Sequence, residues 1–238
     1  MILSIDGMIS LEHDAVRLRV GHCTYLPPAL LAMVHRLRFT RSEGIRIEHH
    51  AGFTGIIAEK VVQKSLDIGF GYLPVRHPEL LAFPLYEEPV VACMSTGHIL
   101  ANKPAICPSD IDGLPVIAVG REILPQMHEE VEKFFAKFRI KLRIVADAFA
   151  PPEAVIVAEH RIGICFVGLS AALRSGTVGK SLSHEMNSQK SGLWVRRESE
   201  NPKLREFVDF VIEESRELPS HSANLNRIRQ IPRLGVAE

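Results

Sequence analysis

Repeated alternation between two hydrophobic periods constrains the fold of this chain more than any other feature of its sequence. Residues 18–22 and 45–48 alternate apolar and polar side chains, as half-buried strands do. Each run is followed by apolar residues at helical spacing, in residues 30–37 and 57–62, and a third strand-like run covers residues 67–71. Parallel strands need a crossover connection, which is usually a helix. The order therefore predicts an α/β protein with a mainly parallel sheet covered by helices.

The second half of the chain continues the same order of strands and helices. Expected strands cover residues 89–94, 116–119, 142–145, 161–167 and 192–195, and expected helices begin near Pro125, Pro151 and Pro202. The last helix follows Asn201, a favourable N-cap residue. Beyond it, residues 219–238 are polar and aperiodic, which predicts a loosely held C-terminal tail.

Composition excludes several classes of protein. The chain of 238 residues is 46% hydrophobic and 24% charged, which is typical of a globular protein and excludes a disordered or fibrous one. Its 28 basic and 28 acidic side chains give a formal net charge of zero, so no global basic field attracts nucleic acid or anionic lipid. The four cysteines form no C-x-x-C pair. We expect them to be reduced, and three of them to be small core residues.

The N-terminal segment lacks the features of a secretory signal. Arg17 is the first lysine or arginine of the chain, and the acidic residues Asp6, Glu12 and Asp14 precede it. The segment before Arg17 contains no unbroken apolar stretch of the kind that a signal peptide needs. No later run approaches the roughly 20 apolar residues of a membrane span. We therefore expect a cytoplasmic protein without a membrane partner.

Four passages in a fixed order give the chain a family resemblance. They are residues 18–21 leading to 25–31, residues 52–54 leading to 66–71, residues 84–92 closing on 97–98, and the helix that begins at Asn201-Pro202. Each passage alone is weak, but their order and spacing are specific. Over residues 17–218 the chain resembles the effector-binding domain of LysR-type transcriptional regulators.

The resemblance implies a type II periplasmic-binding-protein-like fold, in which two Rossmann-like α/β lobes are joined by two crossover strands and hold a small ligand in a cleft. On this template residues 1–16 are an N-terminal extension, lobe I comprises residues 17–91 and 193–218, and lobe II comprises residues 92–192. Regulators of this type read DNA through a winged helix-turn-helix, for which the 16 residues before Arg17 are too few. We therefore expect DNA contact only through a helix-turn-helix that this chain lacks.

The candidate ligand-binding residues of lobe I directly follow expected strands. Ligands of open α/β sheets bind beyond the carboxyl ends of strands and at helix N-termini. Cys23, Thr24 and Tyr25 follow the first strand, while Phe53 and Thr54 precede a helix whose N–H groups and dipole favour a carboxylate. The alternatives are turn and capping chemistry for the threonines and inward packing for Cys23. The resemblance supports a ligand role for Thr54, because the family uses serine or threonine there.

Further candidates lie at the end of the third strand and in lobe II. Tyr72 stands where some aromatic-acid-responsive members of the family have an arginine. A phenol donates one hydrogen bond but forms no bidentate clamp, which argues against a dianionic ligand at this position. Arg121, Phe149 and Phe166 are the candidates of lobe II, with a solvated surface arginine and core packing as the alternative readings.

Metal and catalytic sites find little support in the sequence. His49 and His50 are neighbours on a strand and point to opposite faces, and the other histidines lack a cysteine or carboxylate pattern, so we expect no metal and no cofactor. The sequence contains no G-x-S-x-G elbow, P-loop, helix-opening G-x-G-x-x-G or HExxH motif. We therefore expect no enzyme, although a hydrolase or lyase stays open as an alternative.

The sequence thus predicts a cytoplasmic, dimeric small-molecule sensor of the LysR type that takes part in transcription regulation. A small anionic effector, expected to be a carboxylate, would shift the balance between two lobe arrangements, and a dimer interface would receive that shift. The resemblance places this interface on residues 28–41, 45–49 and 127–138. The alternatives are a stand-alone ligand-binding or interaction protein without DNA-binding activity of its own, and a regulator represented by a truncated gene.

Overall fold

The computed structural model describes residues 16–37, 45–121, 123–184, 186, 188–199 and 201–219. Over these residues the chain divides into two compact units. Unit 1 is built from residues 16–86 and 190–218, and unit 2 from residues 87–189. The expected N-terminal extension up to residue 15, the expected tail from residue 220, and residues 38–41 of the expected interface helix lie outside the described residues.

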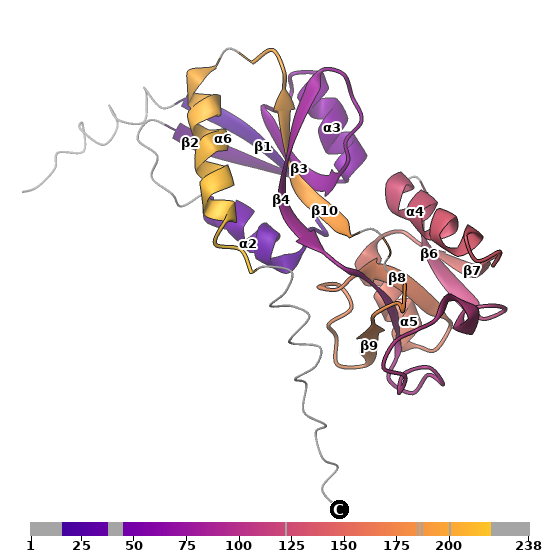
Figure 1. Ribbon diagram of the computed structural model, residues 1–238. Helices are drawn as coiled ribbons and strands as arrows, with labels where there is room; N and C mark the ends of the chain where they lie inside the picture. The colour runs from indigo at the N-terminus through magenta and orange to yellow at the C-terminus, as the bar shows by residue number, and fades with distance from the viewer. Residues whose placement is uncertain are drawn as a thin grey trace, which may run out of the picture. The chain divides into compact units, whose positions relative to one another are not determined.

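Unit 1 is a three-layered α/β structure. It is built on β1 (Val16–Cys23), β2 (Ile45–Gly52), β3 (Ile68–Leu73), β4 (Leu80–Glu88), β10 (Gln189–Arg196), α2 (Pro28–Arg36), α3 (Thr54–Val62) and α6 (Pro202–Ser215). The sheet has the order β2-β1-β3-β10-β4. Strand β1 is parallel to β2 and β3, as predicted, whereas β10 is antiparallel to β3. Figure 1 shows α2 and α6 on one side of these strands and α3 on the other.

Two glycines of β3 make room for the single tryptophan of the chain. Trp194 of β10 is fully buried, and β-carbons at Gly69 and Gly71 would lie 2.5 Å from atoms of its ring. Real side chains do not approach so closely, so both positions need glycine. Ile57 of α3 packs on the same face, where a β-carbon at Gly69 would lie 2.8 Å from its Cγ2. The Gly69-Phe70-Gly71 sequence therefore serves core packing.

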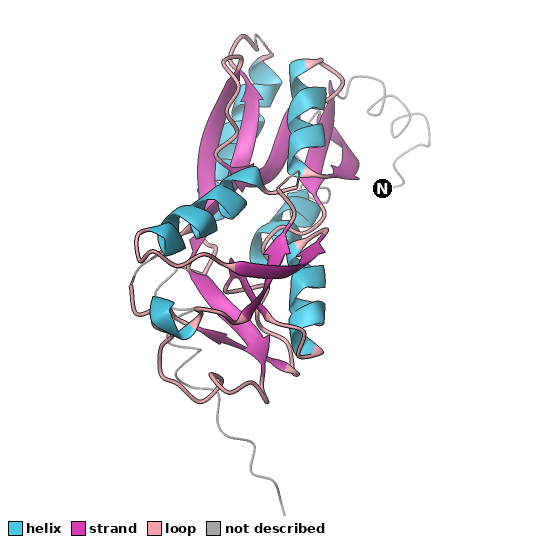
Figure 2. Cartoon of the chain, turned by 90° about the vertical axis from the view of Figure 1, so that its right-hand side faces the viewer, coloured by secondary structure: helices cyan, strands magenta, loops and turns pink. Residues whose placement is uncertain are grey.

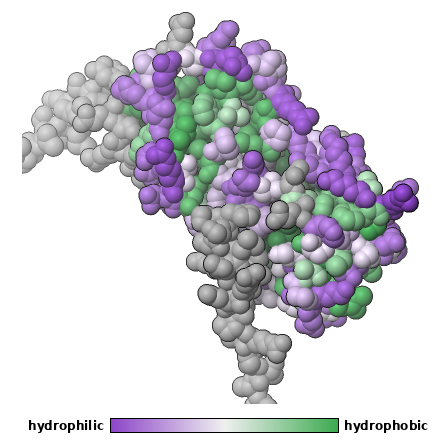
Figure 3. Space-filling view, in the orientation of Figure 1, coloured by the Kyte–Doolittle hydropathy of each residue, from purple (hydrophilic) through white to green (hydrophobic). Residues whose placement is uncertain are grey.

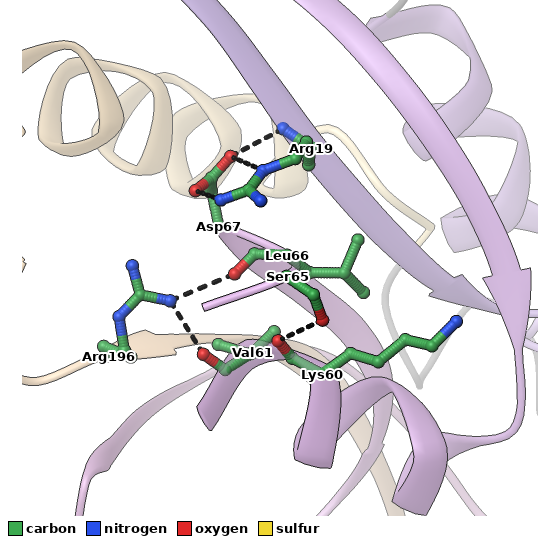
Figure 4. A network of polar contacts seen from close by, with 7 residues as sticks. All are labelled: Arg19, Lys60, Val61, Ser65, Leu66, Asp67 and Arg196. Carbon is green, nitrogen blue, oxygen red and sulfur yellow. Dashed lines mark hydrogen bonds and ion pairs between the residues drawn. The ribbon is translucent and has the colours of Figure 1, made fainter. Parts of the chain in front are cut away.

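A polar network ties the start of β3 to β1 and the end of α3 to β10 (Figure 4). Arg19 donates to both carboxylate oxygens of Asp67, over 2.8 Å from Nη2 and 3.1 Å from Nε, and its backbone N–H donates over 2.8 Å. Arg196 donates to the carbonyl oxygens of Val61 and Leu66 over 2.7 and 3.0 Å. These charge-assisted bonds fix the connection between α3, which begins at the candidate Thr54, and β3, which contains the candidate Tyr72.

Unit 2 is a second mixed sheet with its own core. It contains β5 (Val90–Ser95), β6 (Pro115–Val119), β7 (Arg143–Ala148), β8 (Ile164–Gly168), β9 (Thr177–Lys180), α4 (Pro125–Ala136), α5 (Pro151–Glu159) and the 3₁₀ helix η2 (Pro108–Asp110). The order is β7-β6-β8-β5-β9, with β6 parallel to β7 and β8, and β5 antiparallel to β8 and β9. Figure 2 distinguishes the helices, strands and loops of the chain by colour. Phe135 of α4 is fully buried, and its ring lies 5.0 Å from that of Phe166.

The structure corrects the predicted strand at residues 161–167. Strand β8 begins only at Ile164, because Arg161 has a φ of +63°, which no strand residue adopts. Strands β4 and β9 were not predicted. Pro84 and two terminal glutamates interrupt the apolar pattern of β4, and β9 has only four residues, too few for a periodic signal.

Other local predictions are confirmed. Asn201 caps α6, because its Oδ1 accepts from the backbone N–H groups of Lys203 and Leu204 over 3.0 and 3.4 Å. All four cysteines are free, and Cys23, Cys93 and Cys165 are buried while Cys107 is exposed.

A groove with apolar and charged lining residues lies beside α6 in unit 1. Its apolar lining residues are Leu81, Phe83, Val195, Leu204 and Val208. Figure 3 shows the apolar surface of unit 1 next to the hydrophilic outer face of α6. Leu81 and Phe83 of the edge strand β4 line this groove and are half-buried, so α6 does not fully cover this side of the sheet.

Candidate functional site

Six of the predicted ligand-binding residues lie at one edge of the unit 1 sheet. Strands β2, β1 and β3 are parallel neighbours whose register pairs Cys23 with Gly52 and His22 with Phe70. Their carboxyl ends therefore reach the same edge, which is where open α/β sheets bind ligands. The six residues are Cys23, Thr24, Tyr25, Phe53, Thr54 and Tyr72. The backbone of Thr24 donates to Gly52 across this edge over 3.2 Å.

Helix α3 presents backbone donors at this edge. Its N-cap is Phe53, and no side chain of the described residues caps it. The first helical bond runs from Ile57 N to Phe53 O over 2.9 Å, so the N–H groups of residues 54–56 precede the helical hydrogen-bond ladder. A β-carbon at Gly55 would meet no atom within 4 Å, so the space beside this residue is open. The donors and the helix dipole together favour an anion.

The Thr54 side chain connects α3 to β3. Its Oγ1 accepts a hydrogen bond from the backbone N–H of Tyr72 over 3.3 Å. The hydroxyl therefore does not cap its own helix, which was the alternative reading of this residue. A hydroxyl that accepts one bond retains a proton that it can donate.

Three aromatic rings form a wall next to the helix end. Tyr25 and Tyr72 stack with their ring centroids 5.7 Å apart, and Phe53 lies 5.8 Å from Tyr25. Both tyrosines are buried, and the Tyr72 hydroxyl donates to the carbonyl oxygen of Tyr25 over 2.6 Å. Because this bond uses the proton of the phenol, Tyr72 contributes its ring rather than a donor.

The buried side chains of this edge carry no negative charge at neutral pH. Burial raises the pKa of the Cys23 thiol, and burial together with the neighbouring Cys23 raises the pKa of the Tyr25 phenol. The Tyr25 hydroxyl has no hydrogen-bond partner of good geometry among the described residues. An anion at this edge therefore meets neutral thiol and phenol groups.

The three lobe II candidates lie in unit 2. Arg121 and Phe149 follow the neighbouring parallel strands β6 and β7, where Gly120 N donates to Ala148 O over 2.9 Å. The Arg121 guanidinium pairs with Glu132 over 2.9 Å, and both side chains are largely exposed. Phe149 is exposed, whereas Phe166 is buried and packs on Phe135. These placements correspond to a surface arginine for Arg121 and core packing for Phe166.

Two features of unit 1 escaped the sequence reasoning. The sequence carries no signal that singles out Gly55, and its open surroundings follow only from the packing around α3. His22, His35 and His49 converge from three elements, although only the adjacent pair His49-His50 stood out in the sequence. The alternation of the two strands is the signal that places His22 and His49 on one face, once the pairing register is known.

Comparison with known proteins identifies the family. The model of the LysR substrate binding domain matches residues 12–216. The Hca operon transcriptional activator HcaR of Escherichia coli K12 is 24% identical over 164 residues, which are 65% of this chain and 53% of that protein. The chain thus spans about half the length of this relative.

Solved structures share the fold. The effector-binding domain of QuiR in complex with shikimate has a TM-score of 0.74 at 16% identity, covering 85% of this chain and 98% of that one. The BenM effector-binding domain with its effector benzoate has a TM-score of 0.68 at 18% identity, covering 83% and 90%. In the described part of the chain, no helix is long and apolar enough to cross a membrane. With its type II periplasmic-binding-protein-like fold and a family match over most of its length, the chain belongs to the LysR substrate binding domains.

Proposed function

We propose that this chain senses a small carboxylate effector, which binds at the unit 1 edge formed by Thr24, Phe53, Thr54 and Gly55. The observation that carries the proposal is the start of α3, where uncapped N–H groups beside an open Gly55 lie at the carboxyl ends of three parallel strands. A carboxylate accepts several N–H bonds at once and is stabilised by the helix dipole.

The neighbouring groups favour an uncharged ligand body with one acidic group. Phe53, Tyr25 and Tyr72 offer apolar ring surface, and Thr24 is an exposed hydroxyl that can donate. Shikimate in QuiR and benzoate in BenM are both monocarboxylates with a six-membered ring. Because Tyr72 replaces a guanidinium with a phenol whose proton is already used, a second carboxylate would lack a partner there.

The activity that we propose is regulatory and involves no catalysis. An effector changes the population of two conformations only by its difference in affinity for them. We propose that a homodimer receives this change, with α2, β2 and α4 as interface elements, on the basis of the family resemblance. We also propose that contact with operator DNA requires a separate helix-turn-helix domain, and that the regulator acts in the cytoplasm.

Thermal unfolding with matched ligands tests the carboxylate proposal. Benzoate and shikimate are compared with benzamide and the methyl ester of shikimate, which keep the ring and remove the charge. A ligand at ~100 times its Kd stabilises by about 2.7 kcal/mol, which raises Tm by roughly 5–10 °C in a chain of this size. We expect a saturable shift with at least one of the acids and none with its neutral partner. Equal shifts for both members of a pair, or no shift with any carboxylate in a broader panel, would refute the proposal.

Variants of Thr54 locate the site. Thr54→Val removes the hydroxyl at nearly constant shape, while Thr54→Ser retains the acceptor for Tyr72 N. We expect Thr54→Val to weaken effector binding at least roughly tenfold, since a hydrogen bond to a charged group contributes about 1.5–3 kcal/mol, and Thr54→Ser to keep most of the affinity. Thr96→Val, an exposed threonine of unit 2, is the matched control. Affinity that is unchanged in Thr54→Val would place the effector elsewhere.

A further inference from the structure

Three histidines from separate elements of unit 1 lie side by side. His22 belongs to β1, His35 to the last turn of α2, and His49 to β2. The ring centroid of His22 lies 5.0 Å from that of His35 and 5.8 Å from that of His49, while His35 and His49 stack at 5.7 Å. One ring nitrogen of each lies within 4.8 Å of those of the other two. This cluster does not use the proposed effector-binding residues Thr24, Phe53, Thr54 and Gly55, but His35 and His49 lie on α2 and β2, which are also proposed as interface elements.

The sheet register explains why these side chains meet. The parallel pairing sets Val20 opposite His49 and His22 opposite Ala51, so His22 and His49 are diagonal neighbours on one face. Helix α2 contributes the third imidazole. His50 points to the opposite face, where its Nε2 lies 3.3 Å from Glu48, and so takes no part in the cluster.

The most buried member of the cluster has an unsatisfied nitrogen. His22 is 6% exposed, and its Nδ1 has no hydrogen-bond partner among the described residues. A buried polar atom without a partner costs about 1–3 kcal/mol, so such an atom calls for an explanation.

We propose that His22, His35 and His49 bind a divalent transition-metal ion of the zinc type. Imidazole nitrogens bind Zn²⁺ at about 2.0–2.1 Å, which places the nitrogens of a tetrahedral site roughly 3.4 Å apart. The present separations, within 4.8 Å, exceed that value, so binding requires side-chain rotation, for which the exposed His35 has room. Three imidazoles suit Zn²⁺, Co²⁺ or Ni²⁺ rather than Mg²⁺ or Ca²⁺, which prefer oxygen ligands.

In the single chain His35 is exposed, which leaves the fourth coordination position to water. Bound in this way, the ion links β1, β2 and α2 and holds the helix against the sheet. Because the unfolded chain does not preform the site, binding stabilises the folded state. The alternative reading is a purely aromatic cluster, in which stacked and edge-on imidazoles pack without an ion.

Titration of the untagged, metal-free full chain with Zn²⁺ and Co²⁺ separates these readings. We expect one ion per chain by calorimetry, a rise in Tm of roughly 5–10 °C at ~100 times the Kd, and visible Co²⁺ absorption typical of tetrahedral coordination. His35→Ala removes an exposed ligand and is expected to fold. It should weaken Zn²⁺ binding by more than roughly 100-fold, beyond the 10–100-fold loss typical of outer-shell changes.

Two further variants complete the design. His49→Gln removes a half-buried ligand and should reduce Zn²⁺ affinity as His35→Ala does, while His160→Ala, an exposed histidine of α5's C-terminal end, should leave it unchanged. The proposal is overturned by the absence of saturable 1:1 binding, by equal binding in His35→Ala, or by a cobalt–thiolate charge-transfer band, which would place the ion on a cysteine.

Discussion

The ion pair between Arg19 and Asp67 is expected to stabilise unit 1 far more than the Arg17–Glu48 pair, which starts from the same strand. The carboxylate accepts two bonds from the guanidinium and one from the Arg19 backbone, and its side chain is only 15% exposed. Asp67→Asn removes the charge and one of the two guanidinium acceptors. Net contributions of hydrogen bonds to charged groups are about 1.5–3 kcal/mol. Because the Arg19 side chain is 37% exposed, screening favours the lower part of that range.

We therefore expect Asp67→Asn to lower the free energy of unfolding by about 2 kcal/mol, or Tm by roughly 4–8 °C. Trp194 is the single tryptophan and is fully buried in unit 1, so its fluorescence in urea reports this unit directly. Glu48→Gln is the matched control. It removes the carboxylate that lies 3.4 Å from Arg17, with side chains 63% and 44% exposed, and 3.3 Å from His50 Nε2. This change should cost less than about 0.5 kcal/mol.

Acidification gives an independent test of the same pair. Burial alone would raise the pKa of Asp67, but the hydrogen bonds and charge of Arg19, with a contribution from Arg196, lower it overall. A carboxyl whose pKa is lowered on folding binds protons more readily when unfolded, so its stabilising contribution is present above the unfolded pKa of about 4 and is lost as pH falls below it. The difference in free energy of unfolding between wild type and Asp67→Asn should thus be constant from roughly pH 6 to 8 and shrink below about pH 5. A cost no larger than that of Glu48→Gln, or a difference that grows in acid, would refute the reasoning.

Packing and capping contacts elsewhere give three more tests. Gly69→Ala places a β-carbon 2.5 Å from Trp194 Nε1 and should destabilise unit 1 by about 1–3 kcal/mol in urea, whereas Gly55→Ala, with no atom within 4 Å, should not destabilise it. Asn201→Ala removes the α6 cap and should cost about 1 kcal/mol by the same measurement; an unchanged midpoint would show that the cap is dispensable. Ellman's reagent should titrate one thiol in the native chain, Cys107, and four in denaturant, because the other three are buried and the pKa of Cys165 is raised by its hydrogen bond with Cys93 and by burial. A second fast-reacting native thiol would contradict the burial of Cys23, Cys93 and Cys165.

Apolar periodicity and capping residues were sufficient to predict the strands and helices whose burial follows a clear period. The parallel order of β1, β2 and β3 follows from helical crossovers between half-buried strands, and the α6 cap follows from Asn201 before Pro202. Apolar periodicity did not predict an element correctly where the backbone conformation interrupts it or where the strand is too short to show it. Arg161 delays β8 through its left-handed backbone, and β9 is too short to show alternation.

The sequence by itself determined the α/β class, the family and the segments that hold the candidate ligand-binding residues, because periodicity and ordered motifs are local properties of the chain. Only the tertiary structure decided how side chains from distant segments combine. The Tyr72 phenol donates to Tyr25, Thr54 accepts from Tyr72, and three histidines meet across β1, β2 and α2. Such contacts depend on strand register and helix packing, which bring together residues far apart in the chain and which no local pattern encodes.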